Sequence, residues 1–166
     1  MIYEAGTAAA GLRVVTVIAG SGPLEEQRLY QDMATELGLA GTYFIGPHDQ
    51  PALARLYNVA DLGVFPTKFE AFGLVFIECL ACGTPVIGTA AGGPLEFVDD
   101  TVGALVPDVD DALAFSDALG ETITRALLED WKREKHEACL ARASRYTLTV
   151  QCEAILAAVR RTGPRR

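Results

Sequence analysis

The sequence has few basic residues and no long apolar run. Of its 166 residues, 14 are Lys or Arg and 22 are Asp or Glu, so the net charge is -8 and the isoelectric point is about 4.7. Such a surface repels a phosphate backbone, which argues against a nucleic-acid partner. No stretch approaches the roughly 18 apolar residues of a membrane-spanning helix, so we expect no integral membrane segment. The N-terminus lacks a basic stretch followed by an apolar one, which predicts no signal peptide and a cytoplasmic location.

Cysteine and histidine are also scarce, with four Cys and two His in the chain. Cys79 and Cys82 form a lone C-x-x-C, a spacing that occurs in redox and zinc sites. The pair lies in an apolar helical run, and no second ligand pair has the spacing of a zinc finger. We therefore interpret these residues as small buried thiols. Seven acidic and no basic residues occupy Asp99 to Glu121, which suits a cation site or, more simply, solvated loops and helix starts.

Half of the residues are apolar, which is enough for one sizeable core but not for two ordinary domains. Strand and helix patterns alternate along the chain at short spacing. The expected strands are Arg13–Gly20, Thr42–Gly46, Leu62–Pro66, Thr84–Gly88 and Ala104–Val106. The expected helices are Leu24–Leu37, Gln50–Asn58, Gly73–Ala81, one or two within Asp110–Arg142, and Leu148–Arg160. We interpret the first strand as buried, and we expect the last helix to pack back across the domain.

This alternation is typical of right-handed βαβ units. It predicts an α/β fold with a Rossmann-like, mostly parallel sheet flanked by helices. Ligands in such sheets bind beyond the carboxyl ends of the strands. The candidate binding loops are therefore Gly20–Pro23, Gly46–Asp49, Pro66–Gly73 and Gly88–Gly93.

The long helical region after Pro107 has its own pattern. Leu119, Ile123, Leu127 and Trp131 form one apolar stripe, so we interpret Trp131 as a packing residue rather than a ligand platform. The same region predicts two ion pairs at i,i+4 spacing, Glu121 with Arg125 and Glu129 with Arg133.

Two acids near the middle of the chain are the main candidates for chemistry. Glu70 lies in a loop at the end of a strand, and Glu78 lies five residues into the helix that Gly73 opens. At ~1.5 Å per residue, Glu78 is roughly 7 to 8 Å along that helix. The start of the helix offers N–H groups to an anion, those of Phe72, Gly73, Leu74 and Val75. A ligand with a negative middle and hydroxyl-rich ends, such as a nucleoside diphosphate sugar, suits this layout.

Several motifs around these acids resemble those of family four of the retaining GT-B glycosyltransferases. Glu70 and Glu78 match its Glu-x7-Glu motif. The surrounding segments Glu70–Leu74, Cys82–Ile87 and Gly92-Gly93 also resemble that family. Upstream, Ala19–Pro23, Phe44–Gly46 and Tyr57–Asp61 follow in the order and spacing of that family's donor-binding domain. The similarity covers about Val14 to Val159.

The resemblance implies roles for individual residues. Glu70 would bind hydroxyls of the transferred sugar and support positive charge at its anomeric carbon, and Glu78 would accept the ribose hydroxyls. The N–H groups of Gly73, Leu74 and Val75 would hold the diphosphate. Other donor contacts would come from Gly22, beside the phosphates, and from the loop of His48, beside the base. The family requires no metal, so we expect no metal and no cofactor besides the nucleotide-sugar substrate.

The chain departs from the family pattern at its start. The family's donor domain opens with one further strand and helix, whose Arg and Lys neutralise the diphosphate. Only residues 1–12 precede Arg13 here, and they contain neither Arg nor Lys. We hypothesise that the chain is the C-terminal half of a GT-B fold without its first, central strand and helix. The expected organisation is a poorly defined segment 1–12, a donor-binding domain 13–160 and a basic tail 161–166, with the N-terminal GT-B domain as a missing partner.

Three functions remain open from the sequence. The first is the donor half of a retaining hexosyltransferase, with an acceptor that the sequence does not identify and no activity without the other domain. The second is a catalytically silent nucleotide-binding or partner-docking domain, and the third is a GT-B nucleotide-sugar epimerase. Some residues near the acids also keep a plain structural alternative, as a turn, a loop residue or a helix-start acid: Gly92, Gly93, His48 and Glu96. Lys68 is the one positive charge near the site, and it has no assigned role.

Overall fold

The computed structural model describes residues 11–162, and its α/β architecture confirms the expected fold class. The strands are β1 (Thr16–Ala19), β2 (Thr42–Gly46), β3 (Gly63–Phe65), β4 (Val86–Thr89) and β5 (Gly103–Val106). The α-helices are α2 (Leu24–Glu36), α3 (Gln50–Val59), α4 (Leu74–Ala81), α5 (Ala112–Leu128), α6 (Trp131–Glu134), α7 (His136–Ala143) and α8 (Leu148–Thr162). Two short 3-10 helices, η1 (Gly93–Glu96) and η2 (Ser144–Tyr146), complete the order.

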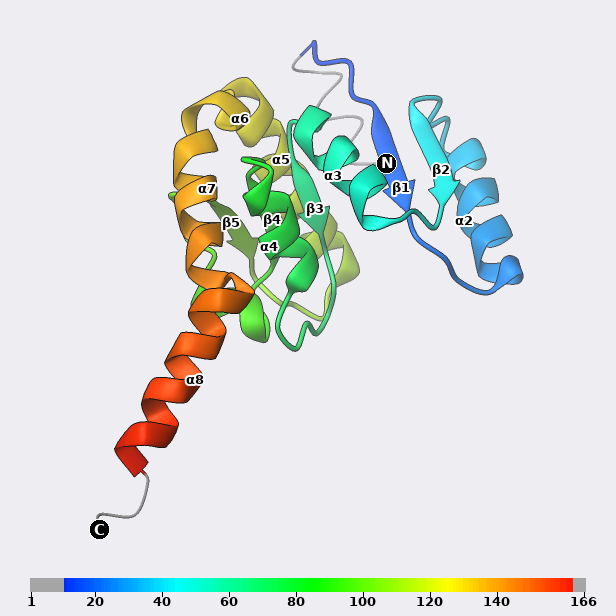
Figure 1. The fold of residues 1–166 in the computed structure, drawn as a ribbon. Coiled ribbons are helices and arrows are strands. Elements are labelled where there is room, and N and C mark those ends of the chain that lie inside the picture. Colours follow the sequence, from blue (N-terminus) through cyan, green and yellow to red (C-terminus); the bar gives the residue numbers. More distant parts are fainter. Residues whose placement is uncertain (1–10, 163–166) are drawn as a thin grey trace.

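The strands form two parallel sheets, one with the order β1-β2 and one with the order β3-β4-β5. In the second sheet, Val86 of β4 lies opposite Gly63 on one side and Gly103 on the other. Within residues 11–162, no strand joins β1 to β3, and α3 lies near this break (Figure 1). The break falls where we expected a central strand to be missing. The expectation about Met1–Leu12 concerns mainly residues outside those that the structure describes.

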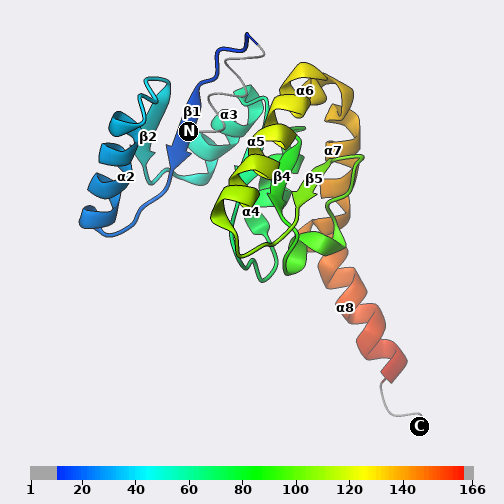
Figure 2. The same ribbon diagram turned by 180° about the vertical axis from the view of Figure 1, so that it is seen from behind.

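Helices cover both faces of the three-stranded sheet. Helices α4 and α7 lie on one face in Figure 1, and the view from behind in Figure 2 shows α5 over the other. Each face of this sheet packs against its own hydrophobic core. Neighbouring residues of β4 contribute to different cores, because successive strand residues point to opposite faces. Val86 packs with Phe76, Leu80 and Phe97 on the α4 side, whereas Ile87 packs on the α5 side. The central strand is therefore buried on both faces.

The first strand differs from our expectation of a buried strand. Val17 and Ile18 are 46% and 44% exposed, and neither α2 nor α3 contains a fully buried residue. The reason lies in the pairing, because within the described residues β1 has a strand neighbour on one side only. The apolar run predicts a strand correctly, but its burial depends on a second neighbour.

The region Asp110–Arg142 forms three helices rather than the expected one or two. The chain breaks at Asp130, whose backbone has a positive φ of 50°. Because of this break, the predicted pair between Glu129 and Arg133 is absent. Arg133 instead pairs with Asp130 and Glu134, while Glu129 accepts a hydrogen bond from the Trp131 indole at 2.8 Å.

Trp131 is a packing residue, as predicted. It is 6% exposed and lies in the core cluster on the α5 side of the sheet, with Ile87 and Ile123. The Arg125 guanidinium and the Lys135 ammonium lie 5.5 and 4.6 Å from its ring centroid.

The last helix corrects another expectation, because α8 projects away from the body of the domain instead of packing across it (Figure 1). Its apolar side chains Leu148, Ile155 and Leu156 are 81%, 62% and 54% exposed. Most of the predicted basic tail, residues 163–166, lies outside the described part of the chain. Among residues 11–162, none of the helices combines the length and apolar character needed to span a membrane.

Candidate functional site

The loop between β3 and α4 shapes the start of α4 around one glycine. Gly73 is the N-cap of α4 and has a φ of 91°, a conformation that residues with a Cβ rarely adopt. A Cβ at this position would lie 3.2 to 3.3 Å from side-chain atoms of Phe76, Phe97 and Pro94. The glycine therefore lets the chain turn sharply into the helix while it is packed against three neighbours.

The side chain of Glu70 is bonded to the N-cap residue of this helix. Its Oε1 accepts a hydrogen bond from the N–H of Gly73 at 3.1 Å. We expected the Gly73 N–H to be free for an anion, and the structure differs because the nearest anion is the chain's own carboxylate. A carboxylate at a helix N-terminus is also favoured by the helix dipole. Glu70 thus lies where the sequence placed it, at the mouth of α4.

Two amides of α4 remain open. Among the described residues, the N–H groups of Leu74 and Val75 have no hydrogen-bond acceptor, as is normal in the first turn of a helix. Leu74 is 64% exposed, so this end of the helix faces outward. Phe72 is 40% exposed, and its ring centroid lies 6.1 Å from that of Phe97.

Glu78 lies one turn further along α4. It is half-buried, and it shares a helix side with Leu74 because residues four apart are neighbours on a helix. Its Oε1 accepts a hydrogen bond from Nε2 of Gln50, the first residue of α3, at 3.0 Å. Burial, reinforced by the nearby Cys79 and Glu78, raises the pKa of Tyr57 to about 12. Both predicted acids therefore lie at α4. Glu70 lies at the start of the helix, and Glu78 lies on the side of the helix that faces α3.

Sequence reasoning did not identify Gln50 as a site residue. The contact joins residues 28 positions apart on two helices, and no periodicity within either helix reports it. The only sequence clue is that Gln50 follows Asp49, an N-cap residue, directly after one of the candidate binding loops.

Gly92 and Gly93 do more than form a turn. The N–H of Gly93 donates to the carbonyl of Glu70 at 2.8 Å. A Cβ on Gly92 would lie 2.1 Å from that same carbonyl oxygen, and one on Gly93 would lie 2.5 Å from the carbonyl oxygen of Phe72. Only glycines allow the loop after β4 to approach the Glu70 loop this closely. The close approach of the two loops fixes the backbone of Glu70.

The two other predicted donor contacts lie on the loops after β1 and β2. These loops are joined by a hydrogen bond from the N–H of Gly20 to the carbonyl of Gly46, at 2.9 Å. A Cβ on Gly22 would meet only a side-chain oxygen of Glu26, at 3.9 Å, so the backbone there is open. The His48 ring is exposed, with Nδ1 3.2 Å from the Gly46 carbonyl oxygen. Both residues are therefore accessible at the carboxyl ends of their strands.

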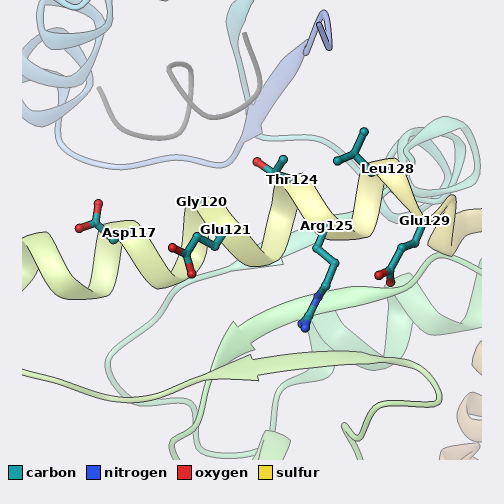
Figure 3. Close-up of a pocket in the computed structure, with 7 residues that line it drawn as sticks. All are labelled: Asp117, Gly120, Glu121, Thr124, Arg125, Leu128 and Glu129. Atoms are coloured by element: carbon teal, nitrogen blue, oxygen red, sulfur yellow. The ribbon is translucent and has the colours of Figure 1, made fainter. Parts of the chain in front are cut away.

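Other candidates lie apart from the two acids. Lys68 pairs with Asp110 at 3.8 Å on the exposed surface. A groove of about 450 Å³ runs along α5, and its lining residues do not include Glu70 or Glu78 (Figure 3). Cys79 is free and fully buried, as expected, whereas Cys82 is free but only half-buried, which differs from that expectation. Cys139 is also free and fully buried. In the described residues, no three or more His, Cys, Asp or Glu side chains are arranged to hold a metal ion.

Comparison with known proteins gives a family match over most of this chain. The family model for "Glycosyl transferases group 1" matches residues 7–143. A D-inositol 3-phosphate glycosyltransferase from Mycobacteroides abscessus is 39% identical over 130 residues. That alignment covers 75% of this chain and 29% of the relative. The chain therefore spans less than a third of that relative's length.

Solved structures have the same fold. Sucrose-phosphate synthase from Thermosynechococcus elongatus matches 95% of this chain and 42% of its own, with a TM-score of 0.74 and 29% identity. Anabaena HepE, solved in complex with UDP-glucose, matches 95% of this chain and 44% of its own, with a TM-score of 0.75 and 25% identity. Both likenesses extend over nearly all of the chain but less than half of the neighbour.

Proposed function

Because the chain belongs to the group 1 glycosyl transferases, we propose that it forms the nucleotide-sugar donor-binding half of a retaining hexosyltransferase. Such an enzyme moves a hexose from a nucleoside diphosphate sugar to an acceptor hydroxyl. The observation that carries the proposal is the arrangement at α4. Glu70 lies at the start of the helix, Glu78 lies one turn along it, and the N–H groups of Leu74 and Val75 between them are open.

The proposed donor lies across the start of α4. The diphosphate accepts hydrogen bonds from Leu74 and Val75 and is favoured by the helix dipole. Glu78 accepts the ribose hydroxyls, and Glu70 accepts hydroxyls of the hexose. The open loops of Gly22 and His48 border the phosphates and the base. The likeness to HepE, which was solved with UDP-glucose, supports this class of ligand.

In the proposed reaction, the bond between the anomeric carbon and the diphosphate oxygen breaks first. Positive charge grows on the sugar, and the carboxylate of Glu70 stabilises that charge. The acceptor oxygen then bonds to the anomeric carbon on the face that the diphosphate left. Its proton passes to the leaving phosphate, so the configuration is retained. We expect binding and transfer to need no metal, and a cytoplasmic location remains a prediction of the sequence.

We also propose that the chain alone binds the donor without transferring it. A helix N-terminus contributes ~0.3 to 2 kcal/mol toward an anion. Enzymes lower barriers by roughly 8 to 23 kcal/mol, and positioning of the second substrate supplies about 7 to 11 kcal/mol of that. The residues that would hold an acceptor are expected in the N-terminal GT-B domain, the proposed missing partner.

Calorimetry tests the proposal. The purified chain should bind at least one of the uridine, guanosine and adenosine diphosphate sugars in preference to the others, and EDTA should not change the affinity. Glu78→Ala should weaken that binding by about tenfold or more, whereas Glu153→Ala on the projecting α8 should not. A chain that binds no nucleotide sugar, or all of them without preference, would favour a docking domain instead.

A further inference from the structure

Gln50 and Glu78 form a side-chain contact between two helices at the candidate site. Gln50 is the first residue of α3, and its Nε2 donates to Oε1 of Glu78 at 3.0 Å. We propose that Gln50 is a positioning residue, which aims the Glu78 carboxylate at the hydroxyl groups of a bound nucleoside. This inference rests on the proposed function of the same site.

The backbone holds Gln50 in a fixed place. Asp49 caps α3 by accepting a hydrogen bond from the N–H of Ala52 at 2.9 Å. Pro51 follows as the second helical residue, where its fixed φ suits the first turn. Because the capping residue Asp49 precedes Gln50 and Pro51 follows it, the backbone that carries the Gln50 side chain is well fixed.

The far end of α3 is tied to the segment that follows α4. The hydroxyl of Thr84 donates to the carbonyl of Tyr57 at 2.6 Å, and Tyr57 packs against the core cluster that includes Cys79 and Leu80 of α4. Residues seven apart lie on the same side of a helix, so Gln50 and Tyr57 both face α4. The backbones that carry Gln50 and Glu78 are therefore held side by side by the packing of two helices.

The chemistry of the two side chains decides which one donates the hydrogen bond. The amide of Gln50 can only donate through nitrogen, and it occupies one oxygen of the Glu78 carboxylate. In the described residues, Oε2 of Glu78 has no hydrogen-bond partner and remains open to a hydroxyl. A carboxylate fixed by a charge-assisted hydrogen bond loses little freedom when the ligand arrives, which favours binding.

The test uses UDP as the probe and measures its dissociation constant by calorimetry from pH 5 to 8. Gln50→Ala should weaken binding by about tenfold, the size expected when a carboxylate loses one hydrogen bond. Gln50→Glu should bind weakly at pH 8, because two carboxylates then face each other. Its affinity should recover toward pH 5, where the two acids share one proton and the shared hydrogen bond returns.

Controls separate this effect from general ones. Tyr57, Cys79 and Cys82 lie near Glu78 and stay neutral over this range because burial raises their pKa values. His48 lies two residues before Gln50, so each profile is compared with that of the unmodified chain. Gln151→Ala and Gln151→Glu on the exposed α8 repeat both substitutions away from the site.

The outcomes are distinct. Two results together support the proposal: Gln50→Ala binds UDP more weakly than the unmodified chain, and only Gln50→Glu loses affinity at pH 8 and regains it toward pH 5. A merely structural role of Gln50 would not restore the affinity at low pH. If both variants bind UDP like the unmodified chain at every pH, the role of Gln50 is overturned while the proposed function stands. If the unmodified chain binds none of UDP, GDP and ADP, both fall. Circular dichroism checks that the exposed substitutions leave the fold intact.

Discussion

The carboxylate of Glu70 accepts a hydrogen bond from the N–H of Gly73, with a distance of 3.1 Å between Oε1 and nitrogen. The acid proposed to meet the sugar is thus bonded to the N-cap residue of the helix proposed to meet the diphosphate. Gly93 fixes the same residue by donating to its carbonyl at 2.8 Å. The loop acid is therefore held by both its side chain and its backbone before any ligand arrives.

Removing this hydrogen bond should destabilise the domain. We expect Glu70→Ala to lower the free energy of unfolding by about 0.5 to 1.5 kcal/mol, the net contribution of a typical hydrogen bond. Glu70→Gln keeps an acceptor oxygen and should lose less. Urea unfolding measures both, with Glu153→Ala on α8 as the matched control. Equal stability of Glu70→Ala and the control would show that this hydrogen bond contributes nothing to the free energy of unfolding.

Substitution of Gly73 can separate the stability cost of close packing from the cost of a positive backbone φ. Gly73→Ala places a Cβ 3.2 to 3.3 Å from three side chains in a backbone with φ of 91°. Gly38→Ala introduces a Cβ at φ of 71° with nothing within 4 Å, so it carries the strain alone. The strain costs roughly 1 to 2 kcal/mol.

We expect Gly73→Ala to cost more than Gly38→Ala, and the difference in their urea unfolding free energies isolates the packing at the mouth of α4. Equal losses would mean that the neighbouring rings move aside freely.

Much of the architecture could be predicted from the sequence because it is encoded locally. The expected helix Leu24–Leu37 lies between Pro23 and Gly38, residues that favour a helix start and a helix end, and α2 spans Leu24–Glu36. The positions of Glu70 at a loop end and Glu78 within a helix follow from the same kind of pattern. Turn and cap residues act over a few positions, so a sequence reports them directly.

Features that depend on distant partners could not be predicted. The apolar run of β1 looks like a buried strand, yet Val17 is 46% exposed because its burial depends on which strands lie beside it. The projection of α8 and the contact of Gln50 with Glu78 also depend on how whole elements are placed. Periodicity describes one element at a time and contains no such information.

Trp131 should be a major contributor to stability. It is 6% exposed, the Arg125 and Lys135 cations lie near its ring, and its indole N–H donates to Glu129 at 2.8 Å. Trp131→Ala should cost about 3 to 5 kcal/mol through the cavity it leaves. Trp131→Phe should cost less, because it keeps an aromatic ring in the core cluster.

The chain contains one Trp, so its fluorescence reports this site alone. We expect blue-shifted emission and weak quenching by acrylamide in the folded protein, with a red shift on unfolding. Red-shifted emission from the native chain would contradict the burial of Trp131.

Asp99 gives the stability a definite dependence on pH. A hydrogen bond from Thr101 and the contacts of Arg142, whose Nη2 lies 2.7 Å from Oδ2, hold the pKa of Asp99 below its ordinary value. A carboxylate with a lowered folded-state pKa stabilises the fold above its unfolded pKa of about 3.9. That contribution disappears as the pH falls through the lower folded-state value. Urea midpoints from pH 2 to 7 should therefore decline at the acidic end.

Asp99→Asn should be less stable than the unmodified chain at neutral pH and should lose less as the pH falls, so that the two curves converge in acid. The neighbouring Asp100→Asn is the matched control, because the structure uses its backbone carbonyl, which accepts from Lys135, rather than its side chain. Its curve should follow that of the unmodified chain throughout. Curves for Asp99→Asn that stay parallel to the unmodified chain down to the lowest pH would mean that the Asp99 carboxylate is not linked to folding, since only a group whose pKa differs between the two states changes the slope.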